Sequence, residues 1–353
     1  MQLLLAVLAL PLASAQLNEL AQKAGKLYFG TATDNEDIGF QNKTYLQILN
    51  DTKEFGQLTP SNGQKWFAVE PELGVFNYSY GDVVADIATA NKQILRCHNL
   101  VWHSQLAPWG YGISYLEQRK PHRRSHRPRN QRSQTLVQPM LRLGRGQRSP
   151  QRRRDLSQRH LPPSPRPEYI RIAFRAAAAA DPHAKLYYND YNIESPNNKS
   201  AAVRALVRDL KKEGIRIDGV GLQSHFTAGS APSIDNLIWT MEGYTKLGVE
   251  VALTELDIRI MEPETSSNLA QQSSDYKNAV GACMLVDGCV GVTVWDFWDP
   301  VSWVPGVFTG MGSACLWFGN FTKHPAYQGV VEALTNDTRR GFGGGGGHNG
   351  GWW

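Results

Sequence analysis

The stretch Val249-Glu-Val-Ala-Leu-Thr-Glu255-Leu-Asp257-Ile258 combines an apolar, strand-like run with two carboxylates near its end. Similar runs recur along the chain at residues 27–33, 93–103, 185–192, 218–226 and 290–299. Amphipathic segments separate some of them, and Ser200 to Gly214 and Asn268 to Leu285 are long enough to be crossover helices. Strands that alternate with helices in this way indicate βαβ units and a parallel sheet.

Five of these runs end in polar or aromatic residues. These are His103, Asn189 with Asp190, Gln223 with His225, Glu255 with Asp257, and Trp295. One such residue is usually structural, because strand-end carboxylates are often simply hydrogen-bonded and tryptophan is often part of the core. Five together favour a functional site. We therefore expect a (β/α)8 TIM barrel, in which the carboxyl ends of the strands meet on one face.

One segment does not fit this pattern. Residues 119–166 contain 14 Arg and one Lys against a single acid, Asp155, and so contribute +14 to the net charge. The whole chain has a net charge of +5, so the remainder of the chain has a net charge of −9. The body of the protein is acidic, and its basic pI is no sign of nucleic-acid binding. We treat residues 117–166 as anomalous, and we expect the fourth strand region of the barrel to be disrupted there.

The two ends of the chain differ from its body. Residues 1–15 form an apolar block that closes with Ala13-Ser-Ala15, as a cleaved secretory signal does. Residues 339–353 are mostly glycine and are predicted to be a disordered tail, which leaves 16–338 as the barrel domain. A secreted, extracellular protein is expected, with no membrane span. Asn-x-Ser/Thr sequons for glycosylation occur at Asn42, Asn50, Asn77, Asn198, Asn320 and Asn336.

Several longer motifs stand at or near the strand ends. They are Asn62-Gly-Gln-Lys65-Trp66, Trp102-His103-Ser-Gln105, Tyr188-Asn189-Asp190-Tyr-Asn192, Gly221-Leu-Gln223-Ser-His225, Thr254-Glu255-Leu-Asp257 and Trp295-Asp-Phe-Trp-Asp299-Pro-Val-Ser-Trp303. Together they resemble the fungal endo-β-1,4-xylanases of glycoside hydrolase family 10, over residues 17–116 and 167–335.

The resemblance implies roles for several residues. Glu255 would be the nucleophile of a retaining, double-displacement reaction on xylan, and His225 would orient it and keep it ionised. Asn62, Lys65, His103 and Gln223 would bind the sugar at the cleavage site, with Trp295 and Trp303 as aromatic walls. Ser61 and Phe67 depart from the acidic residues that the family usually has at these positions, which could shift substrate preference.

The cysteines are compatible with an oxidising compartment. Cys283 and Cys289 are six residues apart and could close a small loop, and they resemble a pair that the fungal enzymes bridge. Cys97 and Cys315 have no obvious partner. No Cys or His pair has the spacing of metal ligands, so neither a metal nor a cofactor is expected. The expected partner is xylan, and the protein is expected to be a monomer.

The second catalytic carboxylate is missing from the chain. In the family it lies at the end of strand four, in Trp-Asp-Val-Val-Asn-Glu-Ala, where this chain reads Leu143-Gly-Arg-Gly-Gln-Arg148-Ser149. That heptapeptide can be encoded CTG GGA CGT GGT CAA CGA AGC. Read one base later, these codons give TGG GAC GTG GTC AAC GAA GC, which is the family string. The hypothesis is a frame error between about residues 117 and 166, with the acid/base glutamate at the Arg148/Ser149 junction of the alternative frame.

Three alternatives remain at this point. A barrel that has lost its acid/base could bind xylan without cleaving it. A β-1,4-glucanase on the same fold is the second, because xylose differs from glucose only by the absent hydroxymethyl group. A nucleic-acid-binding protein is the third, although the Arg-rich segment has no interleaved aromatic residues.

Overall fold

The computed structural model describes residues 16–34, 38–102, 104–110, 133–137 and 168–336. In this part of the chain, eight parallel strands form a closed barrel. The strands are β1 (Tyr28–Thr33), β2 (Gln57–Pro60), β3 (Ile94–Cys97), β4 (Ser133–Val137), β5 (Lys185–Asp190), β6 (Gly219–Leu222), β8 (Glu250–Met261) and β9 (Cys289–Val294). Each pairs with the next in this order, and β9 pairs with β1 to close the ring. The expected barrel is confirmed.

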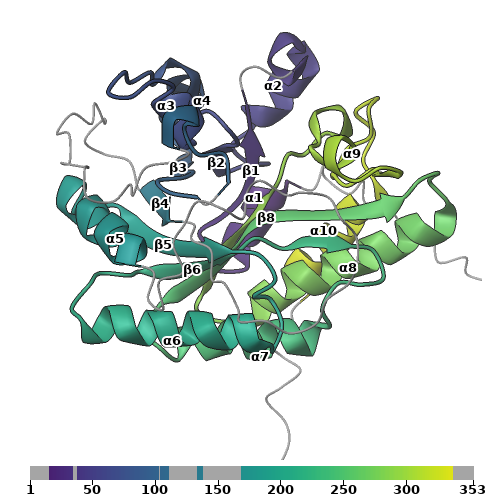
Figure 1. Ribbon diagram of the computed structural model, residues 1–353. Helices are drawn as coiled ribbons and strands as arrows, with labels where there is room; N and C mark the ends of the chain where they lie inside the picture. The colour runs from purple at the N-terminus through teal and green to yellow at the C-terminus, as the bar shows by residue number, and fades with distance from the viewer. Residues whose placement is uncertain (1–15, 35–37, 103, 111–132, 138–167, 337–353) are drawn as a thin grey trace, which may run out of the picture.

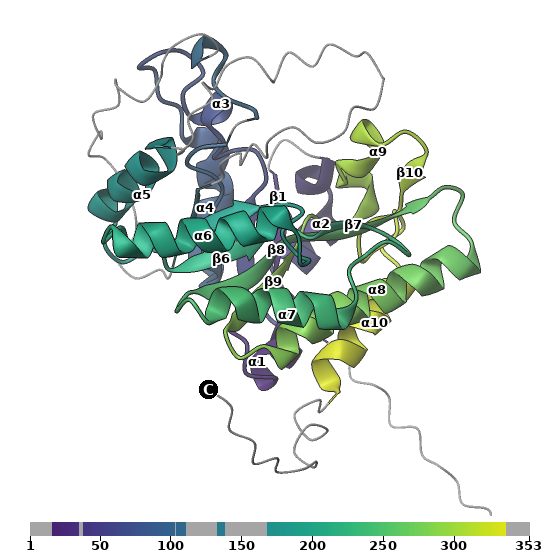
Figure 2. The ribbon, with the colours of Figure 1, turned by 60° about the horizontal axis from the view of Figure 1, so that its bottom comes forward.

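Helices lie on the outside of the strands (Figures 1 and 2). They are α1 (Leu17–Lys23), α2 (Lys43–Leu49), α3 (Trp66–Val69), α4 (Ser79–Asn91), α5 (Glu168–Ala180), α6 (Asn198–Lys212), α7 (Ile234–Thr245), α8 (Ser266–Leu285), α9 (Val304–Val307) and α10 (Pro325–Thr335). Figure 2 shows α6, α7 and α8 side by side along one side of the barrel. Capping boxes at Asn197 and Thr265 fix the starts of α6 and α8, because each side chain accepts a backbone N–H that the helix leaves unpaired.

Two short strands extend the sheet beyond the barrel. β7 (His225–Thr227) pairs in parallel with the upper part of β8, with His225 opposite Asp257 and Thr227 opposite Arg259. β10 (Met311–Gly312) runs antiparallel to the last residues of β8. In Figure 1, β8 is the long strand that reaches out toward α9. The nucleophile candidate therefore lies on a strand that is anchored on both sides.

The strand bounds differ from the predicted runs for identifiable reasons. The run at 218–226 divides into β6 and β7 because Ser224 has the left-handed φ of 65° between them. β9 ends at Val294, just before Asp296 at φ 63°. The ladder of β3 stops at Cys97, so most of the predicted run 93–103 is loop.

A fourth strand is present, but it does not lie where the family motif was expected. Ser133–Val137 pairs in parallel with β3 and with β5, so the sheet continues through this position. The strand precedes the stretch Leu143 to Ser149, where the family motif for strand four was expected. That stretch lies outside the described residues, as do most of residues 117–166, the predicted signal 1–15 and the predicted tail 339–353.

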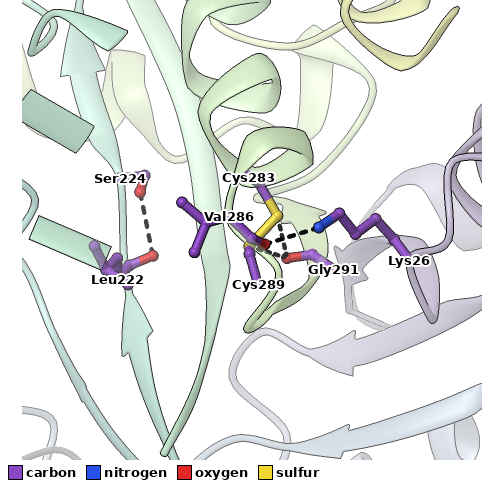
Figure 3. Close-up of a disulfide and its surroundings, with 7 residues drawn as sticks. All are labelled: Lys26, Leu222, Ser224, Cys283, Val286, Cys289 and Gly291. Atoms are coloured by element: carbon purple, nitrogen blue, oxygen red, sulfur yellow. Dashed lines mark hydrogen bonds between the residues drawn. A yellow bond between two sulfur atoms is a disulfide. The ribbon is translucent and has the colours of Figure 1, made fainter. Parts of the chain in front are cut away.

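The disulfide expected between Cys283 and Cys289 is present, with the Cα atoms 5.3 Å apart. It joins the end of α8 to the start of β9 (Figure 3). Beside it, the buried Lys26 donates its Nζ to the carbonyl of Val286 at 2.9 Å. The turn at which β9 enters the barrel is thus fixed both covalently and by a hydrogen bond from the segment before β1. Cys97 and Cys315 form no disulfide within the described part of the chain.

None of the described helices has both the length and the apolar character that crossing a bilayer requires.

Candidate active site

Glu255 lies near the carboxyl end of the barrel portion of β8 and is 4% exposed. Its Oε1 accepts the side-chain N–H of Asn189 at 2.6 Å, and its Oε2 lies 3.3 Å from His225 Nε2. Asn189 comes from β5 and His225 from β7, so three strands converge on one carboxylate. The backbone carbonyl of Gln223 accepts the N–H of Glu255 at 3.0 Å, which places the predicted Gln223 beside it.

His225 bridges two carboxylates. Its Nδ1 lies 2.8 Å from Asp257 Oδ2, and the indole of Trp303 donates to the same oxygen at 2.7 Å. Because β-strand side chains alternate, Glu255 and Asp257 project from the same face of β8, and the imidazole fits between them. A protonated imidazole donates from both nitrogens, so it can hydrogen-bond both carboxylates at once.

These contacts determine the charge state of the site. Burial raises the pKa of Glu255, but the hydrogen bond from His225 and the nearby Arg96 outweigh it and lower the pKa to about 2. Burial lowers the pKa of His225, and the carboxylates of Asp257 and Glu255 outweigh it, so the pKa is raised above its ordinary value. At neutral pH, Glu255 is therefore an ionised carboxylate beside an imidazolium.

A second layer holds Asn189 in place. Arg96, which is fully buried on β3, donates its Nη2 to Asn189 Oδ1 at 3.3 Å. Thr254 Oγ1 donates to the same oxygen at 2.6 Å. With its oxygen held in this way, the amide presents its N–H to Glu255, so the orientation of the amide is determined by its partners.

Asn62 and Lys65 form a separate polar cluster after β2. Lys65 Nζ donates to Asn62 Oδ1 at 2.9 Å and to Gln105 Oε1 at 2.7 Å, and it lies 5.0 Å from the ring centre of Trp102. Asn62 Nδ2 in turn donates to Asp34 Oδ2 at 2.6 Å. Burial lowers the pKa of Lys65 to about 8, against the raising effect of Glu255 and Asp34. Because the charge of Glu255 affects the pKa of Lys65, the two clusters interact electrostatically.

The aromatic residues stand around the imidazole of His225. The ring of Trp303 is 4.9 Å from it and that of Trp295 is 6.2 Å from it, both edge to face. Trp295 also contacts His98 at 5.0 Å and is only 6% exposed, whereas Trp303 is half-buried. Burial lowers the pKa of His98 to about 3, so this histidine is neutral.

Two residues next to the site have left-handed backbone conformations. Ser224 (φ 65°) lies between Gln223 and His225, and Asp296 (φ 63°) follows Trp295. The N–H of Ser224 donates to the buried carboxylate of Glu194 at 2.8 Å. Such conformations cost a non-glycine residue on the order of 1 kcal/mol or more and persist where surrounding contacts enforce them.

Most of the predicted site residues thus come together. Glu255, His225 and Gln223 adjoin one another, Trp295 and Trp303 flank His225, and the Asn62–Lys65 pair lies within electrostatic reach of Glu255. His103 lies outside the described residues.

The prediction missed Asp34, and it named Asn189 at a strand end without giving it a role. Asp34 directly follows β1, so the strand-end rule applied to the first strand could have found it.

No acidic residue is present in β4, whose sequence is Ser-Gln-Thr-Leu-Val. Among the described residues, Asp257 is the carboxylate linked to Glu255 through His225, and it already accepts hydrogen bonds from His225 and Trp303. The described site therefore offers an ionised carboxylate, Glu255, without a partner carboxylate on the fourth strand.

A further group of possible metal-binding side chains lies away from Glu255. Ligand atoms of Glu264, Asp299 and His324 lie within 4.8 Å of one another. The Nε2 of His324 is 2.6 Å from Asp299 Oδ2, so these two side chains already pair with each other.

These features define a parallel (β/α)8 barrel protein with a buried carboxylate centre at the carboxyl ends of its strands. The chain belongs to glycosyl hydrolase family 10, whose model matches residues 16–126 and 153–333 and leaves out the segment between them.

Relatives and solved structures agree with this assignment. Endo-1,4-beta-xylanase A of Humicola insolens is 49% identical over 338 residues, which cover 92% of this chain and 88% of that protein. The crystal structure of a GH10 xylanase from Bispora sp. MEY-1 with xylobiose superposes with a TM-score of 0.77 at 35% identity, covering 90% of this chain and 99% of that one. The Penicillium canescens endo-1,4-beta-xylanase XylE gives 0.76 at 36% identity, covering 90% and 97%.

Proposed function

We propose that the gene behind this chain encodes a secreted, retaining endo-β-1,4-xylanase in which Glu255 is the nucleophile. The ionised Glu255, held by Asn189 and His225, is the observation that carries the proposal. The names of the relatives, several of which are endo-1,4-beta-xylanases at 42–49% identity, support xylan as the substrate.

The reaction needs two steps and a second carboxylate. First, Glu255 forms a bond to the anomeric carbon, the bond to the leaving oxygen breaks, and an acid gives that oxygen a proton. Then the residue that acted as the acid, now a base, takes a proton from water. This water attacks the anomeric carbon, and the bond between that carbon and Glu255 breaks. In the proposed enzyme, Asn62, Lys65, Gln223 and His103 hold the sugar hydroxyls, and Trp295 and Trp303 enclose the ring.

The frame hypothesis accounts for the missing acid. The family model matches on both sides of residues 127–152 but not within them, and the string for strand four is recoverable one base out of frame at Leu143 to Ser149. The coding DNA across residues 110–170 decides the matter. Absence of GAA or GAG at the Arg148/Ser149 junction in the alternative frame would refute the frame error.

Activity measurements would distinguish the chain as written from the enzyme that the restored reading frame encodes. A positioned acid/base contributes about 10²- to 10⁴-fold, so the written chain should hydrolyse xylan near background. An aryl xylobioside with a good leaving group should still give a burst of about one phenol per Glu255, because departure of that phenol needs no acid. The restored frame should turn over xylan fully, and Glu255→Gln should abolish this. Robust xylan turnover by the written chain would overturn the assignment of the carboxylates.

The lack of an acid in β4 favours one alternative for the chain as written. If the DNA truly encodes the Arg-rich segment, the protein would be a barrel that binds xylan without cleaving it. Comparative rates of the restored enzyme on xylan and carboxymethyl-cellulose would separate a xylanase from a β-1,4-glucanase.

A further inference from the structure

We propose that Arg259 and Phe308 form a remote subsite of the cleft, which holds a carboxylate-bearing substituent of the polysaccharide. This inference rests on the proposed function, because it assumes that a xylan chain lies along the face that presents Glu255.

Strand geometry places Arg259 in line with the nucleophile. Side chains alternate along a strand, so Glu255, Asp257 and Arg259 share one face of β8. The pairing of His225 with Asp257 and of Thr227 with Arg259 continues the same register. At about 3.3 Å per residue, Arg259 lies roughly 13 Å along the strand from Glu255, which exceeds the length of a single sugar ring. The subsite is therefore remote from the bond that is cleaved.

A continuous path of ring contacts connects the two positions. His225 touches Trp303 at 4.9 Å, Trp303 touches Phe308 edge to face at 5.5 Å, and the guanidinium of Arg259 lies 4.1 Å from the centre of the Phe308 ring. Trp303, Phe308 and Arg259 are all half-buried, so each keeps some surface for a ligand. The neighbouring Met261 is 59% exposed, which leaves this end of the path open to solvent.

The charge of Arg259 is not neutralised within the described part of the chain. Its Nη1 donates to the backbone carbonyl of Phe226 at 3.3 Å, its buried Nε has no acceptor, and no described carboxylate forms an ion pair with it. By contrast, Arg171 is held by both oxygens of Glu213. A half-buried guanidinium without a carboxylate has spare donors in the fork geometry that matches one.

The same contacts identify the kind of ligand. The guanidinium covers a face of Phe308, so that face is not available for stacking against a neutral sugar ring. What the subsite offers is a cation supported by an aromatic ring. A uronic acid branch on the xylan chain provides the matching carboxylate.

The test is calorimetric titration of the chain with two xylo-oligosaccharides of equal backbone length, one of which carries a uronic acid branch. This measurement needs no turnover. The wild-type chain should bind the branched ligand about tenfold more tightly, as one charge-assisted contact allows. Arg259→Met should remove this preference and leave the affinity for the unbranched ligand within about twofold. Arg259→Lys should keep part of it, because lysine keeps the charge and loses the fork. Arg208→Met, at an exposed position on α6, also removes one positive charge and should change the affinity for neither ligand.

The outcomes are separable. Equal binding of both ligands by the wild type, or a preference that survives Arg259→Met, would refute the subsite and leave the proposed function intact. An equal loss for both ligands in Arg259→Met and Arg259→Lys would assign Arg259 a structural role and also refute it. If the wild type binds neither ligand, the subsite fails, and the proposed function fails with it only if the enzyme with the restored frame also binds neither ligand.

Discussion

Asn189 donates its side-chain N–H to Glu255 at 2.6 Å, and this is the shortest of the contacts described for that carboxylate. A hydrogen bond to a charged group contributes about 1.5–3 kcal/mol, so Asn189→Ala should slow the burst of phenol from an aryl xylobioside by roughly 10- to 100-fold. Stopped-flow absorbance measures the burst rate. Asn236→Ala on the surface of α7 is the matched control, and a burst that is equally fast in both variants would contradict the assignment.

His225 should control the acid limb of activity. Its hydrogen bond is the largest of the contributions that lower the pKa of Glu255 to about 2, so His225→Gln should raise that pKa toward its ordinary value of 4.5. The burst rate should then fall at a higher pH on acidification than it does in the wild type. A pH profile between 3 and 7 is the measurement. An acid limb at the same pH in both proteins would show that His225 does not set the charge of Glu255.

Glu54 should make the protein less stable as the pH rises. This buried carboxyl accepts the hydroxyl of Tyr327 at 3.0 Å, and burial raises its pKa to about 7. The unfolded chain ionises it from about pH 4.5, whereas the folded protein retains the proton until about pH 7, so stability falls between these values. Glu54→Gln should raise the free energy of unfolding by up to about 3 kcal/mol at pH 8 and scarcely at pH 4. Thermal unfolding at both pH values tests this, with the exposed Glu72→Gln as the control. A gain that is equal at both pH values would exclude titration as its cause.

The disulfide between Cys283 and Cys289 should contribute measurable stability. Closing a loop of this size restricts the unfolded chain by about 2 kcal/mol in the loop-entropy model. Cys283→Ser should therefore lower the unfolding temperature, and reductant should have no further effect on the variant. Cys97→Ser, which removes a thiol outside the disulfide, should respond to reductant as the wild type does. Alkylation of the unreduced protein should detect two thiols, and four would contradict the bridge.

The sequence predicted the barrel well because its strands are apolar runs with polar ends. It did not predict β2, because Gln57–Pro60 is short and has polar residues at alternate positions. Gln57 and Thr59 are fully buried and bond each other at 2.7 Å, so their burial depends on a partner that periodicity cannot reveal. Strand ends were also misplaced where single residues such as Ser224 turn the backbone into the left-handed region.

The sequence indicated which side chains lie near Glu255, but it did not indicate the hydrogen bonds that connect them. The sequence placed His225 with Glu255, but the role of Asp257 as the second acceptor of the imidazole became visible only when β7 paired with β8. The support of Asn189 by Arg96 depends on the approach of two strands 93 residues apart. Contacts of this kind follow from the closure of the barrel and leave no local pattern in the chain.

The left-handed residues Ser224 and Asp296 have a consequence for the engineering of this protein. Glycine at either position would adopt the same φ without strain because it has no Cβ, so a search for heat-resistant variants should favour such replacements. The same replacements would loosen the segments that carry His225 and Trp295, because glycine also allows many other conformations. Thermal tolerance and catalytic alignment would then be in competition at two positions that contact no substrate in the proposed mechanism.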